Sequence, residues 1–264
     1  MHRLFLILLT VLFACNQRRS GIIIAGSTSI QPFIEKVAEN FMEKYPTIKT
    51  YVQGGGSTAG IQATFNKTCD LGTSSRKLKP NESNLKKFLI AIDGITVIVH
   101  ENSLINNLTI EQIRGIFSGK IKNWKELGGK DQEIIPVTRE EGSGTRASFE
   151  DMVMGGVAIS DACLVQDSNG AVREIIATTP EGIGYISVGL VDEREKAVAI
   201  NGIKPTIENL MSGEYKFSRP FLLLSICDPS GDVKKFIDYV LSNEGQNILR
   251  KGGLIPVDEL KSER

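Results

Sequence analysis

The residues best suited to bind an ion lie at 139–146, where the chain reads Arg-Glu-Glu-Gly-Ser-Gly-Thr-Arg. An apolar run at 134–137 precedes them and apolar residues at helical spacing follow, so the pattern predicts a strand, a turn and a helix start. A helix start exposes unpaired backbone N–H groups, Ser143 and Thr145 add hydroxyl donors, and Arg139 adds a guanidinium. Ser and Thr are also common helix caps, so this segment alone leaves two interpretations open, an ordinary N-cap or an anion site.

Three further turns of similar composition follow strand-like segments, at 26–29, 54–60 and 73–76. The carboxyl ends of parallel strands meet at one edge of a sheet, so two facing lobes would bring these turns to one cleft. The expected donors are Ser27, Thr28, Ser29, Ser57, Thr58, Thr73, Ser74, Ser75, Ser143 and Thr145, with Arg76 and Arg139 as the charged members. Six hydrogen bonds of about 1.5 to 3 kcal/mol to a charged group exceed the roughly 8 kcal/mol of micromolar binding. The set therefore suits a small tetrahedral oxyanion.

Several function classes are disfavoured by what the chain lacks. Its only histidines are His2 and His100, and neither they nor the cysteines show metal or nucleophile spacing, so we expect no enzyme activity, no metal and no cofactor. The glycine-rich turn at 54–60 has no lysine after its last glycine, which argues against a nucleotide phosphate loop. The net charge is zero and evenly spread, which argues against nucleic acid as a partner.

The first twenty residues are expected to be a signal peptide and a polar tether. A short basic start precedes an apolar run of signal-peptide length at 4–14, and Cys15 follows in a lipobox-like sequence, so we expect export and lipidation of Cys15. Phe13 departs from the usual lipobox residue. For the remaining Cys69, Cys163 and Cys227, buried free thiols are favoured, and a Cys69–Cys227 disulfide stays as the alternative.

Apolar patterning predicts alternating strands and helices. Residues 30–45 follow one helical face until Pro46, and 94–99, 182–187 and 220–226 are strand-like. The strand at 220–226 is expected to return to the first lobe beside 96–99. Asp93, at the entrance of its strand, has two interpretations: a turn residue, which is favoured, or an acceptor facing a ligand.

Taken together, these segments resemble the phosphate-binding lipoproteins of bacterial phosphate ABC transporters, in the branch of smaller members. The resemblance spans about 21–257 and rests on 26–29, 54–60, 70–76, 119–124, 139–146 and 182–187. It implies an α/β type II periplasmic binding protein, with mostly parallel sheets flanked by helices and a ligand cleft between two lobes joined by two strands. We expect lobe I to comprise 21–98 plus 215–264 and lobe II 99–214.

The resemblance also implies a ligand set. The matching phosphate-binding positions are Thr28, Ser29, Ser57, Ser75, Arg139, Ser143, Gly144 and Thr145, and Ser27, Thr58, Arg76, Asp93 and Glu141 are further candidates. Larger members have at the Ser75 position an Asp that accepts the proton of hydrogen phosphate. A carboxylate there disfavours fully ionised anions, whereas Ser both donates and accepts. Asp93 and Glu141 are the candidate substitutes for that acceptor.

The expected function is capture of inorganic phosphate outside the cytoplasm and its delivery to the permease subunits of an ABC importer. The protein is expected to be a monomer, held by its lipid on the membrane and facing the periplasm or the cell exterior. Two alternatives remain open: a binding protein for another oxyanion, such as sulfate or molybdate, and a phosphate sensor or adhesin on the same fold.

Overall fold

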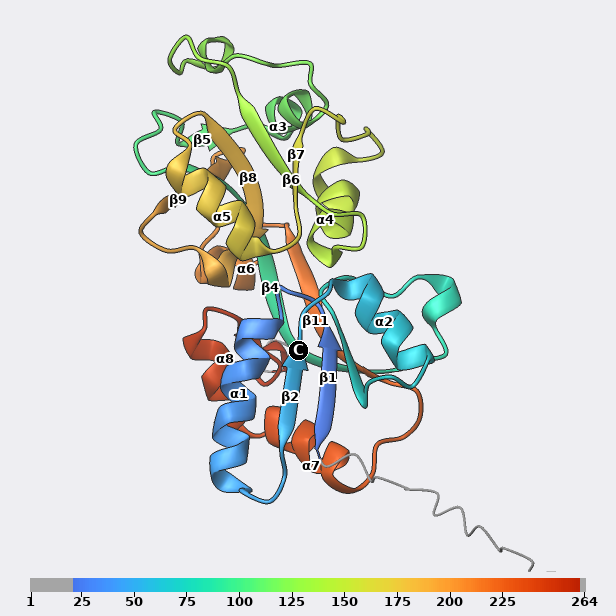
Figure 1. Cartoon of the computed structure of the whole chain (residues 1–264). Helices are drawn as coiled ribbons and strands as arrows, with labels where there is room; N and C mark the ends of the chain where they lie inside the picture. The colour runs from blue at the N-terminus through green and yellow to red at the C-terminus, as the bar shows by residue number, and fades with distance from the viewer. Residues whose placement is uncertain (1–20, 262–264) are drawn as a thin grey trace, which may run out of the picture.

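The computed structural model describes residues 21–261 as two lobes joined by two long strands (Figure 1). The predicted signal peptide, tether and lipidation site at 1–20 lie outside the described residues. The main sheet runs through both lobes in the order β2-β1-β3-β11-β4-β8-β6-β7, with β12 and β9 also pairing with β4. The fold is that of a type II periplasmic binding protein, as predicted.

The first lobe packs helices against three parallel strands, which are β1 (Ile22–Gly26), β2 (Thr50–Gln53) and β3 (Leu71–Ser74). Helix α1 (Gln31–Lys44) buries Phe33, Ile34, Val37, Ala38 and Phe41, the apolar face expected from the sequence. That face joins one apolar core with Phe236 and Leu249 of the C-terminal helices. The other elements of this lobe are α2 (Ser57–Phe65), η1 (Pro80–Glu82), α7 (Gly231–Val240) and α8 (Asn243–Lys251). After α8 come β12 (Ile255–Pro256) and η5 (Glu259–Lys261), whose Ile255 and Leu260 pack against the apolar core of the second lobe.

The second lobe has a separate apolar core around Phe117, Phe149 and Tyr185, whose rings pack on one another. Its strands are β5 (Asn107–Leu108), β6 (Ile135–Arg139), β7 (Leu164–Gln166), β8 (Gly182–Ser187), β9 (Glu195–Ala197) and β10 (Ala199–Ile200). Its helices are α3 (Ile110–Phe117), α4 (Gly144–Phe149), α5 (Asn169–Thr178) and α6 (Ile207–Met211). Shorter turns are η2 (Trp124–Leu127), the π-helical η3 (Glu150–Met154) and η4 (Val188–Leu190).

Strands β4 (Lys86–His100) and β11 (Ser218–Ser225) cross between the lobes in the middle of Figure 1. Ile90 and Ala91 of β4 belong to the first core, whereas Ile95 belongs to the second. The crossing therefore occurs near residues 92–94. The predicted lobe boundaries after residues 98 and 214 remain predictions.

The sheet is mixed rather than mostly parallel throughout. Outer strands of each lobe are parallel, as predicted, but β11 runs antiparallel to its neighbours β3 and β4, and β4 runs antiparallel to its neighbour β8. The reason is topological: one strand enters the second lobe and the other returns from it. Strand β11 pairs with β4 over residues 86–94, not beside 96–99 as predicted, because β8 and β9 occupy that part of β4.

Two further expectations need correction. Asp93 lies inside β4 and is 1% exposed, so its interpretation as a turn residue is wrong. Cys69, Cys163 and Cys227 are all free thiols, which rules out the alternative of a Cys69–Cys227 disulfide. Cys69 and Cys163 are buried as expected, and burial raises the pKa of the Cys163 thiol to about 11, whereas Cys227 is exposed.

Candidate functional site

Hydroxyl groups from three strand ends of the first lobe meet at the interface with the second lobe. Ser27 Oγ donates to Ser75 Oγ at 2.8 Å, and the Ser75 backbone N–H donates to Ser57 Oγ at 3.0 Å. All three residues are at most 2% exposed. Parallel strands β1 and β3 bring Ser27 and Ser75 to the same sheet edge, as the strand-and-turn pattern predicts.

The second lobe contributes the turn at 140–145 to the same interface. Ser143 caps α4, its Oγ accepting from the backbone N–H groups of Thr145 and Arg146, so the N-cap interpretation of this segment is confirmed. Thr145 Oγ1 contacts Ser29 Oγ at 2.8 Å across the lobes. Capping uses the oxygen of Ser143 and leaves its hydrogen to donate, so a cap and an anion donor are compatible in one residue.

Gly144 lies at a close contact between the two lobes. A Cβ atom on this residue would come within 2.2 Å of Ser57 Oγ and 2.6 Å of Ser75 Oγ. Nearby, the Thr58 backbone N–H donates to the carbonyl of Gly142 at 3.1 Å. These contacts join the lobes in a closed arrangement.

Arg139 is the buried charge of the second lobe, at the end of β6 and 1% exposed. Its Nε and Nη2 donate to the two carboxylate oxygens of Glu140 at 2.9 and 3.0 Å, and Nη2 also donates to Thr28 Oγ1 at 3.0 Å. Its Nη1 is buried without a hydrogen-bond partner. An unpaired buried donor on a charged group costs free energy, which an anion at this position would remove.

A second buried arginine, Arg219 of β11, was missed by the sequence analysis. Its Nη1 donates to Thr145 Oγ1 at 2.8 Å and to Ser75 Oγ at 3.3 Å, so it contacts both lobes. Its Nε donates to Asp93 Oδ2 at 2.9 Å, and Ser187 Oγ donates to Asp93 Oδ1 at 2.7 Å. The signal available in the sequence was a charged residue immediately before Pro220 and an apolar run.

Burial dominates the electrostatics of this second pair. Desolvation raises the pKa of Asp93 and lowers the pKa of Arg219, while the attraction between them opposes both shifts. Asp93 lies behind Arg219 with both carboxylate oxygens engaged. The structure therefore gives it the position of a support for Arg219 and not that of an acceptor open to the cleft.

Asn169, the first residue of α5, is another member that the sequence analysis missed. Its Nδ2 donates to Ser29 Oγ at 2.9 Å and its Oδ1 accepts from the Ser187 backbone N–H at 3.3 Å. It is 1% exposed. The segment 167–170 has a turn-like composition, which concealed a side chain that reaches the other lobe.

Some predicted candidates lie away from this cluster. Arg76 donates to both carboxylate oxygens of Glu82, at 2.8 and 2.9 Å, so its guanidinium is already paired inside the first lobe. Glu141 and the Thr58 side chain are exposed. Thr73 and Ser74 bond to the backbone of their own lobe, and Arg146 donates to Glu150 at 2.8 Å.

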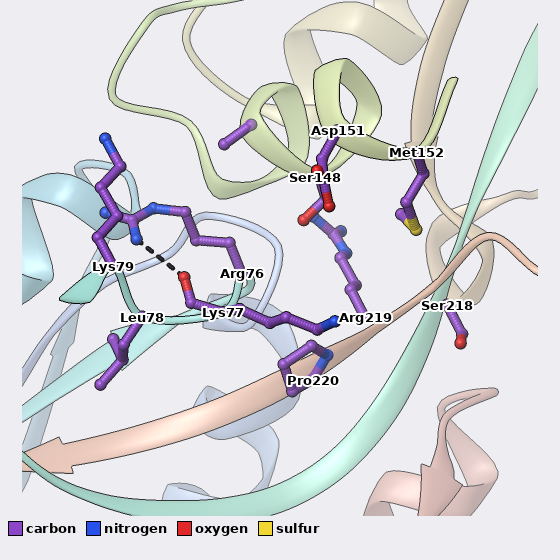
Figure 2. Close-up of a pocket in the computed structure, with 11 residues that line it drawn as sticks. Arg76, Lys77, Leu78, Lys79, Ser148, Asp151, Met152, Ser218, Arg219 and Pro220 are labelled. Atoms are coloured by element: carbon purple, nitrogen blue, oxygen red, sulfur yellow. Dashed lines mark hydrogen bonds between the residues drawn. The ribbon is translucent and has the colours of Figure 1, made fainter. Parts of the chain in front are cut away.

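A cavity of about 310 Å³ lies beside the cluster, between η3, β11 and the loop after β3 (Figure 2). Figure 2 shows that the two arginine side chains point to different places, Arg219 toward Ser148 and the Arg76 guanidinium toward the carbonyl of Lys77. Within residues 21–261, no group of acidic, histidine or cysteine side chains has a metal-binding arrangement. In the same range, no helix combines the length and apolarity needed to cross a bilayer.

Comparison with known proteins places this geometry in a family. The model of the PBP superfamily domain matches residues 14–244. The chain is 35% identical over 256 residues to the phosphate-binding protein PstS of Bacillus subtilis, covering 94% of this chain and 85% of that protein. It belongs to this family of binding proteins. The PstS of Borreliella burgdorferi is 29% identical, with 96% of this chain and 97% of that protein covered.

Solved structures agree with this assignment. A putative phosphate ABC transporter substrate-binding protein from Clostridium perfringens, with bound phosphate, is 40% identical and superposes with a TM-score of 0.86 over 89% of this chain and 99% of that one. An ABC-type phosphate transport receptor from Vibrio cholerae is 36% identical, with a TM-score of 0.74 and the same coverage. The family is one of substrate-binding proteins and not of enzymes, as predicted.

Proposed function

We propose that this protein captures inorganic phosphate between its lobes and delivers it to an ABC importer. One observation carries the proposal: the buried guanidinium of Arg139, which donates to Thr28 Oγ1 across the lobes, has an unpartnered Nη1. The names of the relatives, and the phosphate described for the Clostridium perfringens structure, support this ligand. The proposed phosphate-binding residues are Thr28, Ser29, Ser57, Ser75, Arg139, Ser143, Gly144 and Thr145.

The charge balance of the site fits neutral-donor binding. Glu140 offsets the charge of Arg139 and Asp93 that of Arg219, so the anion meets paired charges and many hydroxyl and amide donors. Hydrogen bonds to a charged group contribute about 1.5 to 3 kcal/mol each, so six suffice for binding at micromolar concentrations or below. No broad basic surface is required.

The rest of the transport assignment is part of the proposal. We expect the protein to act as a monomer outside the cytoplasm, anchored through lipidated Cys15, and to pass phosphate to the permease subunits of the importer. Relatives named as phosphate transport receptors and substrate-binding proteins support this role. Deleting the gene should reduce phosphate uptake by the cells, and unchanged uptake would favour a sensor or adhesin.

A second candidate is binding of another oxyanion, such as sulfate or molybdate. The observation that favours it is Ser75, which stands where a proton-accepting carboxylate was expected, together with Asp93, whose oxygens are engaged with Arg219 and Ser187. Without an acceptor open to the cleft, discrimination against fully ionised anions is weaker.

Isothermal titration of the purified protein with phosphate and with sulfate tests both candidates. We expect micromolar or tighter phosphate binding and weaker sulfate binding, whereas equal or tighter sulfate binding would establish the second candidate. Arg139→Met should weaken phosphate binding at least about a hundredfold, since a charged donor pair is lost. Arg173→Met removes another ion-paired arginine of the second lobe, bonded to Glu195, and should leave binding unchanged.

A further inference from the structure

Arg219 determines whether the Ser75 hydroxyl can accept a further hydrogen bond or only donate one. A serine oxygen accepts at most two hydrogen bonds. Ser75 Oγ receives one from Ser27 Oγ at 2.8 Å and one from Arg219 Nη1 at 3.3 Å. Both acceptor positions are then filled, so the Ser75 hydroxyl can only donate, and Ser57 Oγ lies 3.3 Å away as one partner for its single hydrogen.

Thr145 is oriented in the same way from the other lobe. Arg219 Nη1 donates to Thr145 Oγ1 at 2.8 Å, which directs the Thr145 hydrogen away from the guanidinium, and Ser29 Oγ lies 2.8 Å from the same oxygen. Asn169 Nδ2 likewise donates to Ser29 Oγ. Groups that can only donate thus occupy one acceptor position of Thr145 and one of Ser29.

The crossing strands hold Arg219 in this position. Arg219 and Asp93 are direct partners in the β11–β4 register. The Asp93 carboxylate accepts a hydrogen bond from Arg219 Nε at 2.9 Å and forms an ion pair with Nη2, also at 2.9 Å. This pairing leaves Nη1 as the nitrogen that contacts the hydroxyls of both lobes. The other charged or titratable groups facing Arg219 are Arg139 of β6 and Tyr185 of β8.

We propose that Arg219, fixed by Asp93, is a specificity-determining positioning residue that occupies acceptor positions of Ser75 and Thr145, so that Ser75 cannot accept a proton from the anion. The site then selects the doubly charged form of phosphate over the singly charged form, because a second phosphate hydroxyl would find no acceptor at Ser75. This inference rests on the proposed phosphate function. The selection is then made by a guanidinium on the crossing strands. A carboxylate at position 75 would favour the singly charged form instead, because it accepts a phosphate proton.

The test is phosphate titration of the purified protein at about pH 6 and about pH 8, between which phosphate changes from mostly singly to mostly doubly charged. We expect the wild type to bind at least about fivefold more tightly at the higher pH. The double variant Asp93→Asn/Arg219→Met removes the pair without leaving a buried charge. It should bind at least about tenfold more weakly at the higher pH and less so at the lower, so the ratio between them approaches one.

The matched control is Arg76→Met/Glu82→Gln, which removes the other buried arginine pair and should keep the wild-type ratio. If the Asp93→Asn/Arg219→Met variant does not fold, Arg219→Lys is the substitute, because it keeps the charge but not the planar donor fork. It should move the ratio of the phosphate affinities at the two pH values in the same direction. The proposal is wrong if the wild type binds phosphate equally at both pH values, or if the variants weaken binding without changing the ratio of the two affinities. Either result would show that Arg219 has only a structural role. A wild type that binds no phosphate at either pH would instead refute the proposed function.

Discussion

Two buried arginine–carboxylate pairs, Arg219–Asp93 and Arg76–Glu82, have similar chemistry and different positions. Glu82 is six residues from Arg76, and the pair closes a loop inside the first lobe. Asp93 is 126 residues from Arg219, and the pair joins the two crossing strands. Only Arg219 has a nitrogen left over that contacts hydroxyls of both lobes.

The difference shows that burial of an arginine does not by itself indicate a ligand site. Arg76 follows a hydroxyl-rich strand end, which made it a candidate, yet Glu82 takes both of its terminal nitrogens. Arg219 lies near the start of β11, between Ser218 and Pro220 and ahead of an apolar run, and not in a hydroxyl-rich turn. What matters is whether the partner leaves a donor directed at the interface between lobes.

The largest expected effect is that of Arg219→Met alone. This change leaves Asp93 as a buried carboxylate without its charged partner, so the free energy of unfolding should fall by about 3 to 5 kcal/mol. Urea denaturation monitored by fluorescence measures it. The double variant with Asp93→Asn should recover part of the loss, and a double variant less stable than the single one would contradict the pairing.

Glu82→Gln should have a smaller effect on stability and none on ligand binding. The Gln oxygen can still accept from Arg76, so we expect a loss of about 2 kcal/mol at neutral pH, with phosphate affinity unchanged within about twofold. Urea denaturation and isothermal titration give the two values. A large fall in phosphate affinity would place Arg76 in the binding site after all.

The pH dependence of stability gives a further test of the Arg76–Glu82 pair. Hydrogen bonds from Arg76 hold the pKa of Glu82 below its ordinary value of 4.5. A carboxylate whose pKa is lowered by folding contributes stability above about pH 4.5 and loses it as the pH falls through the folded-state pKa. The stability gap between wild type and Glu82→Gln should therefore narrow below about pH 4.5. A gap that stays constant down to pH 3 would contradict the ion pair.

Ser75→Asp should produce the smallest of these effects. It changes the residue that Arg219 contacts and tests the effect on anion selectivity. The new carboxylate would lie near Arg219 Nη1, which is 3.3 Å from the present hydroxyl. It can accept a phosphate proton but repels sulfate, so sulfate affinity should fall about tenfold more than phosphate affinity, or about 1.4 kcal/mol. Competition titration measures the ratio, and an equal fall for both anions would show that position 75 does not discriminate between them.

Sequence patterns located the parts of this site that depend on local structure. Ser27, Ser57, Ser75 and the turn at 140–145 all follow strands, and a strand-and-turn pattern is sufficient to place such residues at one sheet edge. Arg219 and Asn169 could not be found in this way, because their roles depend on contacts over 74 and 140 residues. The β11–β4 register, which the sequence does not specify, decides that Arg219 faces Asp93.

The expected alternation of strands and helices was confirmed for the same reason, since apolar period and turn residues are local signals. The direction of the crossing strands and the length of β4 were not predicted. Lys86 and Lys87 open β4 with exposed charged side chains, which conceal a strand that continues into a buried segment.

Gly144 has a consequence for how the protein moves. A single methyl group there would overlap the oxygens of Ser57 and Ser75, at 2.2 and 2.6 Å, and so act as a spacer between the lobes. Gly144→Ala should therefore populate a more extended molecule in solution, with a larger radius of gyration by X-ray scattering even in the presence of phosphate. The missing side chain therefore limits how closely the two lobes can approach each other.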